Sequence, residues 1–212
     1  MGNFFQRFFD FFLSFLALLL FSPILFLVFI FSFIMQGSPI FFIHERLGLK
    51  GTPFQMIKFR TMKNGPSLSA KDDEKRLTNY GRFLRRTSID EIPVLFNVLK
   101  GDMSLVGPRP MPLKYFKRFN SYQVKRLNIR PGITGLAQIK GRNSLSWEER
   151  FDFDIDYISR KSIFLDFKIL VKTLFIVIKG EGIKSNDSEI MPEFMGSKEK
   201  NLKNSIETHD NN

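Results

Sequence analysis

The sequence predicts an α+β fold that is mostly helical, with an N-terminal membrane segment and a small domain containing short strands. Three observations lead to this prediction: an uncharged apolar run from Phe11 to Met35, two short extended runs after it, and later segments with apolar residues at helical spacing. A chain of 212 residues has room for one ordinary domain and an appendage. The expected divisions are a membrane segment at 1–36, a domain at 37–184, and a polar tail at 185–212 that is partly disordered.

The charge of the chain points to an anionic partner. There are 32 Lys and Arg residues against 21 Asp and Glu residues, a net charge of +11. Lipid headgroups, nucleotide phosphates and nucleic acid all fit such a charge. Many of the 26 phenylalanines fall in the first 45 residues, where a soluble nucleic-acid binder has no use for them, so we expect no nucleic acid. The absence of cysteine excludes disulfides and thiolate metal sites.

The apolar run from Phe11 to Met35 is long enough, at about 1.5 Å per residue, to cross a hydrocarbon core of about 30 Å. A cleaved signal peptide is not expected, because the run is too long and residues 36–39 (QGSP) carry no cleavage pattern. Ser22 and Pro23 interrupt it near its middle. Proline removes a backbone hydrogen bond, so the segment either spans the bilayer as a kinked helix or turns there and leaves on the side it entered. The Lys and Arg residues after the run place the domain in the cytoplasm.

Two strands are expected after the membrane segment, at Ile40 to Ile43 and at Phe54 to Phe59. Lys58 and Arg60 alternate with apolar residues and so share one face, as solvated surface or as one wall of an anion site. His44 could be a metal ligand or an acid-base group, although a lone histidine beside an apolar strand is more often structural.

Helices are expected further along the chain. One covers Leu77 to Arg86, a basic amphipathic one covers residues 113–129, and an apolar one covers Ile163 to Lys179. The charges inside the last segment and its borderline length argue for a helix half-sunk in the membrane interface rather than a second span. Ser146 and Glu149 fit a capping box for the helix that follows them.

The centre of the chain is RRTSIDEIPVLFNVLKGDMSLVGPR, residues 85–109. Because proline is tolerated only near a helix start, Pro93 predicts a helix that begins close to Asp90, with Asp90 as its cap. There the helix dipole favours an ionised carboxylate, a possible nucleophile or metal ligand. The simpler interpretation is that Ser88 and Glu91 form a capping box and Asp90 merely caps the helix.

Arginines stand on rigid turns around this centre. Gly107 and Pro108 hold a turn that presents Arg109 between two prolines, and Arg142 lies in a second glycine-bearing loop. Such arginines suit bidentate phosphate binding, though each alone is weak support. Asp152, Asp154 and Asp156 alternate, but on a helix they spread around the axis, so a metal cluster is not expected there.

Taken in order, these blocks resemble the bacterial sugar transferases, or monotopic phosphoglycosyl transferases, over residues 5–184, and the length resembles the small members of that family. The matching stretches are FFIHERLG, FQMIKFRTM, GRFLRRTSIDEIPVLFNVLKGDMSLVGPRP, RPGITGLAQIKGRN, WEERFDFD and the tail from LDFKIL to KGEGI. The resemblance implies transfer of sugar 1-phosphate from a UDP-sugar to polyprenyl (undecaprenyl) phosphate, with release of UMP. This is the first membrane step of glycoconjugate assembly.

The resemblance also assigns residues. Asp90 and Glu91 fall on the family's catalytic acid pair, with Asp90 as the nucleophile that forms a covalent phosphosugar intermediate and Mg²⁺ expected at the pair. Ser22 and Pro23 fall on the break of a re-entrant helix, which implies a monotopic protein on the cytoplasmic face of the inner membrane. His44 stands where the family often has glutamine. The cations in matched motifs, candidates for binding substrate phosphates, are Lys58, Arg60, Arg85, Arg109 and Arg142, with Arg85, Arg109 and Arg142 favoured.

Several points stay open at this stage. The donor sugar is not readable; an N-acetylated amino sugar such as di-N-acetylbacillosamine is an expectation by resemblance, with hexoses open. Protein glycosylation or polysaccharide synthesis could use the product, with downstream glycosyltransferases as possible partners, and the oligomeric state is unknown. Two other functions compete: a non-catalytic membrane-anchored basic scaffold, and a bitopic glycosyltransferase that uses an Asp-x-Asp motif and releases UDP.

Overall fold

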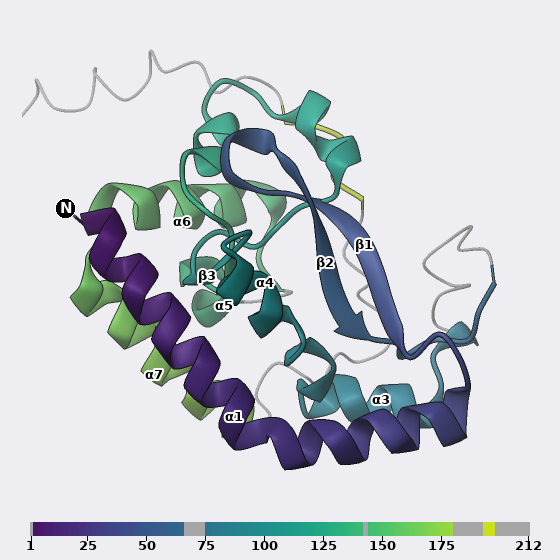
Figure 1. Cartoon of the computed structure of the whole chain (residues 1–212). Helices are drawn as coiled ribbons and strands as arrows, with labels where there is room; N and C mark the ends of the chain where they lie inside the picture. The colour runs from purple at the N-terminus through teal and green to yellow at the C-terminus, as the bar shows by residue number, and fades with distance from the viewer. Residues whose placement is uncertain (1, 66–74, 142–143, 180–192, 198–212) are drawn as a thin grey trace, which may run out of the picture.

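The computed structural model describes residues 2–65, 75–141, 144–179 and 193–197. It is mostly helical, with two small sheets, as the α+β prediction requires. A long helix, α1 (Gly2–Gln36), runs along one side of the folded domain (Figure 1). Within the described residues, Phe4–Gln36 is the helix whose length and apolar composition would allow it to cross a membrane.

Helix α1 stays helical through Pro23 but changes direction about halfway along (Figure 1). A proline inside a helix has no N–H to donate and crowds the preceding turn, so a bend is expected. The Ser22 hydroxyl donates a hydrogen bond to the Leu19 carbonyl at 2.7 Å. The predicted break at Ser22 and Pro23 is therefore a bend in one continuous helix.

Polar side chains in the first part of α1 bond the helix to the domain. Gln6 donates to Asp166 at 3.3 Å, and Arg7 donates to the carbonyls of Val98 and of Leu99, the latter at 2.6 Å. Asp10 is buried and accepts hydrogen bonds from the Ser104 hydroxyl and the Leu105 amide. Since polar groups on an apolar helix need partners, these contacts set which face of α1 meets the domain.

The second half of α1 is fastened in the same way. The Ser32 hydroxyl lies 3.2 Å from the Tyr80 hydroxyl, which itself donates to the Val28 carbonyl, and the Gln36 amide donates to the Arg60 carbonyl at 2.7 Å. Tyr80 belongs to α3 (Asn79–Arg86). Both halves of the helix therefore rest on the same domain.

Two helices turn large apolar side chains to the outside. Helix α7 (Ile163–Lys179) forms where it was predicted and lies beside the N-terminal half of α1 (Figure 1). Its exposed apolar residues are Ile163, Phe164, Phe167, Val171, Leu174, Phe175 and Ile178. Along α1 most phenylalanines and leucines are exposed as well. Such surfaces need an apolar environment outside the domain.

The predicted strands form an antiparallel hairpin of β1 (Phe41–Leu47) and β2 (Pro53–Phe59), in which Phe42 pairs with Lys58 and His44 with Met56. Strand β1 extends further than expected, through His44 and Arg46. Inward residues Phe54 and Met56 pack on α4 (Val94–Lys100), whose Val94 and Val98 are buried. The hairpin thereby carries Lys58 toward the centre of the molecule.

A second sheet was missed by the sequence analysis. Strands β3 (Ser104–Val106) and β4 (Gly132–Thr134) are parallel, and α5 (Leu136–Lys140) follows directly. A β-carbon on Gly132 would lie only 2.1 Å from the Gly107 nitrogen. Three-residue strands are too short to show alternation, so only the close approach of the two backbones reveals them.

The predicted basic helix over residues 113–129 is wrong. Two 3₁₀ helices occupy this stretch, η3 (Leu113–Arg118) and η4 (Gln123–Asn128). Between them Asn120 accepts hydrogen bonds from the amides of Tyr122 and Gln123. An asparagine that bonds nearby backbone amides in this way competes with helical hydrogen bonding and ends the helix.

Helix α6 (Trp147–Arg160) begins with the predicted capping box of Ser146 and Glu149. Phe151 of this helix forms a buried aromatic cluster with Tyr115 and with Phe194 of the tail, which is only 2% exposed. The part of the tail that the structure describes, 193–197, is therefore docked rather than detached; the rest of the predicted tail lies outside the described residues.

The buried tail residue gives the first testable prediction. Phe194→Ala should lower the free energy of unfolding by about 3–5 kcal/mol, because it empties a site filled by an aromatic ring. Thermal unfolding of the detergent-purified protein measures this, with Met195→Ala as the matched control since Met195 is 75% exposed. Equal melting temperatures for the two variants would mean that the tail is not docked in solution.

Candidate active site

The acid pair lies on a tight turn rather than at the start of a helix. Ser88, with φ of 57°, leads into the 3₁₀ turn η2 (Ile89–Glu91), and α4 begins only at Val94, with Pro93 as its cap. The predicted helix cap at Asp90 is therefore wrong, and Ser88 makes no side-chain cap. The turn puts Asp90 inward, 7% exposed, and leaves Glu91 free to pair elsewhere.

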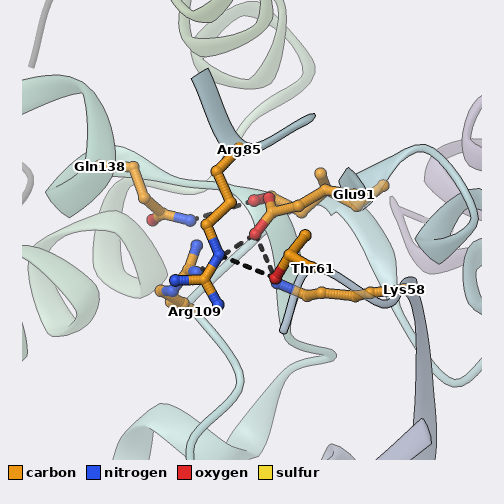
Figure 2. Close-up of polar contacts among 7 residues, drawn as sticks. Lys58, Thr61, Arg85, Glu91, Arg109 and Gln138 are labelled. Carbon is orange, nitrogen blue, oxygen red and sulfur yellow. Dashed lines mark hydrogen bonds and ion pairs between the residues drawn. The ribbon is translucent and has the colours of Figure 1, made fainter. Parts of the chain in front are cut away.

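Glu91 is the point where two cations meet. Its Oε1 atom lies 2.5 Å from Lys58 Nζ and 3.4 Å from an Arg109 guanidinium nitrogen. Lys58 comes from β2 and Arg109 from the turn after β3, so the contact joins three separate segments (Figure 2). These are two of the cations that the sequence assigned to phosphates.

Arg85 enters from the last turn of α3. Its Nε atom donates to the Thr61 hydroxyl at 3.0 Å, and its positive charge acts on Asp90. Figure 2 shows Arg85, Glu91, Arg109 and Lys58 converging around Thr61. The charges in this cluster are therefore three cations and two carboxylates in a small volume.

The turn that carries Arg109 is built by the second sheet. The Gly107 amide donates to the Thr134 carbonyl, and the Gly132 amide donates to the Pro108 carbonyl, each at 2.9 Å. A side chain at Gly107 would collide with the Arg130 carbonyl, 2.5 Å from a β-carbon placed there. The glycine therefore lets the two backbones approach and presents Arg109 toward Glu91.

The environment pushes the pKa values of the two acids apart. Burial, and then the charge of Glu91, raise the pKa of Asp90 to about 6, although Lys58 and Arg85 oppose this. Burial also tends to raise the pKa of Glu91, but the charges of Arg109 and Lys58 outweigh it and lower that pKa to about 2. Neighbouring groups whose pKa values diverge in this way are typical of reactive sites.

Two of the predicted phosphate-binding residues are not brought to this cluster by the described structure. Arg60 is 6% exposed and donates to the carbonyls of Gln36 and Gly37 and to the Asn64 side chain, at the end of α1. Lys58 and Arg60 thus diverge, because Arg60 lies beyond the last residue of β2. Arg142 lies outside the described residues.

The structure adds residues that the sequence analysis did not assign. Thr61 accepts from Arg85, and Gln138 of α5 points toward the same group (Figure 2), donating to the Ile133 carbonyl at 3.2 Å. The Gln138 Oε1 atom is buried without a hydrogen-bond partner. Thr61 and Gln138 lie in two of the blocks that carried the family resemblance, FQMIKFRTM and RPGITGLAQIKGRN. Their place in these blocks was the sequence feature that could have identified them.

His44, whose role the sequence left open, lies at the edge of this cluster. Both imidazole nitrogens are buried without hydrogen-bond partners, and the ring packs on Phe42 at a centroid distance of 4.9 Å. Burial, followed by the charges of Arg46, Lys58 and Arg109, lowers the pKa of His44 to about 4. At neutral pH the imidazole is uncharged and can both donate and accept a hydrogen bond.

A metal at this site would have few protein ligands. Among the described residues, no three His, Cys, Asp or Glu side chains gather into a metal-binding group. Mg²⁺ is commonly held by one or two carboxylates together with substrate phosphates and water. The pair of Asp90 and Glu91 fits a site of that kind, in which substrate supplies the remaining ligands.

Comparison with known proteins gives a consistent family match. A family model described as bacterial sugar transferase matches residues 1–180. An uncharacterized sugar transferase of Bacillus subtilis, EpsL, is 48% identical over 163 residues, which cover 76% of this chain and 81% of that protein.

Two relatives have more specific names. The undecaprenyl-phosphate galactose phosphotransferase of Salmonella typhimurium is 37% identical over 200 residues, 85% of this chain and 42% of that protein. The UDP-glucose:undecaprenyl-phosphate glucose-1-phosphate transferase of Xanthomonas campestris is 40% identical over 154 residues, 66% of this chain and 32% of that protein. The chain thus spans less than half the length of these two relatives.

The raised pKa of Asp90 predicts that removing the charge of this carboxylate stabilises the folded protein at high pH but not at low pH. A carboxyl with a pKa of about 6 when folded and 3.8 when unfolded binds its proton more tightly in the folded state, so stability is lost as pH rises through 6. The penalty at pH 8 is about 3 kcal/mol. Asp90→Asn should therefore raise the melting temperature of the metal-free protein at pH 8 but not at pH 4.

The matched control is Asp156→Asn, which removes a surface carboxylate paired with Arg160 and should change stability little at either pH. A gain for Asp90→Asn of equal size at pH 4 and pH 8 would contradict the pKa assignment.

Proposed function

The chain belongs to the bacterial sugar transferase family, and we propose that it transfers sugar 1-phosphate from a UDP-sugar to polyprenyl phosphate and releases UMP. One observation carries the proposal: a buried carboxylate, Asp90, is acted on by the charges of Lys58 and Arg85, while its neighbour Glu91 forms ion pairs with Lys58 and Arg109. The family match and the names of two relatives support the reaction class. The protein is accordingly an enzyme, a phosphoglycosyl transferase.

In the first half-reaction an Asp90 oxygen attacks the phosphorus that bears the sugar. The bond between this phosphorus and the UMP oxygen breaks, UMP leaves with the electron pair, and the phosphosugar is bound to Asp90 as an acyl phosphate. Transfer of this kind depends mostly on positioning and on neutralising phosphate oxygens. Arg85 and Arg109 are the residues proposed to hold the donor diphosphate.

In the second half-reaction a phosphate oxygen of polyprenyl phosphate attacks the same phosphorus. The Asp90 oxygen leaves, the carboxylate is restored, and the product is a polyprenyl-diphospho-sugar. Glu91 is proposed to keep Lys58 and Arg109 in place through both steps, because it pairs with both and stays ionised, with a pKa of about 2.

Mg²⁺ is proposed at the acid pair, held by Asp90, Glu91 and donor phosphate oxygens. When bound, the ion would neutralise charge on the diphosphate and favour departure of UMP. Asp90 remains the residue that bonds to phosphorus, so one of its oxygens must stay free for attack.

We propose a re-entrant, monotopic topology on the cytoplasmic face of the inner membrane. A straight span would carry one half of α1 away from the domain, yet Arg7 and Asp10 in the first half and Ser32 and Gln36 in the second all bond to it. The opposite face of α1 and the apolar face of α7 would then lie in the lipid.

The competing functions are less well supported. A non-catalytic scaffold gives no reason for a buried Asp90 close to Lys58 and Arg85. A glycosyltransferase using the aspartates of α6 would need them free, but Asp154 pairs with buried Arg126 and Asp156 with Arg160. Relatives named for galactose and glucose make a hexose a reasonable donor beside the expected amino sugar.

The central test follows UMP release. Purified protein with Mg²⁺, polyprenyl phosphate and a panel of UDP-hexoses and UDP-N-acetylamino sugars should release UMP with at least one donor. Asp90→Asn should lose at least 10³-fold in rate because it removes the nucleophile, whereas Asp156→Asn should retain wild-type activity. Release of UDP instead of UMP would support the glycosyltransferase, and an active Asp90→Asn would contradict the nucleophile.

Topology can be tested separately because the chain has no cysteine. Cysteines introduced at Asn3 and at Lys63 should both react with a membrane-impermeant maleimide applied to the cytoplasmic side of inverted vesicles. Labelling of the Lys63→Cys protein alone from that side, with Asn3→Cys reacting only in intact spheroplasts, would establish a span and overturn the re-entrant proposal.

A further inference from the structure

Outside the acid pair, the most enclosed ion pair in the described residues joins Arg126 of η4 to Asp154 of α6. The side chains are 2% and 3% exposed. Arg126 donates to Asp154 Oδ2 through Nε at 3.0 Å and through Nη2 at 2.6 Å. The same Nη2 atom donates to the main-chain carbonyl of Arg109 at 2.8 Å. The buried Arg126 side chain thus holds the main chain of Arg109, a residue proposed to bind phosphate.

The position of the Arg126 guanidinium is closely constrained. It lies over the rings of Phe119 and Phe151, 5.7 and 5.5 Å from their centroids, and the two rings pack edge to face on each other. Phe194 of the docked tail packs on both rings, at 6.0 and 5.0 Å. Stacking on two aromatic faces and bonding to one carboxylate leave the guanidinium little freedom.

Arg109 needs such an anchor, because its side chain is weakly held. The side chain is 47% exposed, and its contact with Glu91 is long, 3.4 Å. Where the guanidinium points therefore depends on the backbone from which it extends. The neighbouring anchors, at Gly107 and Pro108, are bonds between backbones, whereas the Arg109 carbonyl itself is held by the Arg126 side chain.

Stability alone is a poor explanation for this pair. Removing two charges from water is costly, and replacing a buried ion pair by apolar residues of similar size is often neutral or stabilising. The surrounding cluster is already aromatic, so apolar residues would fit there. What apolar residues could not supply is the hydrogen bond to the Arg109 carbonyl.

We propose that Arg126 and Asp154 are positioning residues, which fix the Arg109 main chain so that its guanidinium meets the donor diphosphate. The inference rests on the proposed function and deepens it. Asp154 orients Arg126, Arg126 holds the Arg109 carbonyl, and Arg109 reaches Glu91 and the substrate. Loss of the pair affects donor binding through Arg109, with the chemistry at Asp90 left intact.

The test is a thermodynamic cycle on the full chain. Arg126→Met/Asp154→Leu replaces the pair by apolar residues of similar size, and Arg109→Ala removes the guanidinium that the pair is proposed to position. UMP release is measured at saturating polyprenyl phosphate with varied UDP-sugar. In the wild-type background the apolar replacement should raise KM for the donor about tenfold, with kcat changed less than threefold. In the Arg109→Ala background it should change KM and kcat less than twofold.

The outcomes separate the two proposals. If the apolar replacement raises KM by the same factor in the Arg109→Ala background as in the wild type, the pair acts independently of Arg109. That result overturns the positioning role. An unchanged KM in the wild-type background overturns it as well. If the wild-type protein releases no UMP with any donor, the proposed function itself fails.

Two further variants guard against a general effect on the fold. Arg118→Met/Glu193→Leu removes another ion pair beside the same aromatic cluster, 2.8 Å long, that has no bond to Arg109. It should leave KM within twofold. If Arg126→Met/Asp154→Leu fails to fold, Arg126→Lys substitutes for it: the ammonium keeps the charge beside Asp154 but lacks the planar fork, and the same rise in KM is expected.

Discussion

The Glu91 carboxylate, paired with Lys58 and Arg109, is the interaction on which the rest of the site depends. Its two partners come from a hairpin and from the turn between two parallel strands, so the pairing needs both sheets in place. The pairing leaves Asp90 beside a permanent negative charge in a buried turn. Burial, and then the charge of Glu91, raise the pKa of Asp90, and the charges of Lys58 and Arg85 only partly oppose this rise. Two adjacent acids thus have pKa values of about 6 and about 2.

The membrane helix and the site are linked over a short stretch of backbone. Gln36, at the end of α1, donates to the Arg60 carbonyl, and Arg60 returns a bond to the Gly37 carbonyl at 2.8 Å. The next residue, Thr61, accepts from Arg85. Arg60 is therefore best explained as the cation that closes the end of the helix, next to the residue that orients Arg85. A displacement of the end of α1 would therefore move Arg60 and, through the adjacent Thr61, the Arg85 side chain.

Much of the architecture follows from local patterns. The apolar helix around Pro23, the hairpin, the capping box at Ser146 and the apolar α7 were all predicted, because each depends on periodicity or on side chains only a few residues apart. The errors fall where tertiary contacts or short-range polar groups override the pattern. Asn120 splits an expected helix, and the parallel pairing of β3 with β4 joins segments that look like loops.

The sequence by itself determined the membrane helix, its proline bend and the adjacent acids between cations, and the resemblance of its motifs determined the family. Only the tertiary structure decided which cations reach the acids. Lys58 meets Glu91 while Arg60, two residues later, turns to the helix end, and Arg126 reaches Arg109 from a segment that reads as ordinary basic surface. The physical reason is that pairing energies depend on distance and burial, which are properties of the folded chain and leave no periodic mark in its sequence.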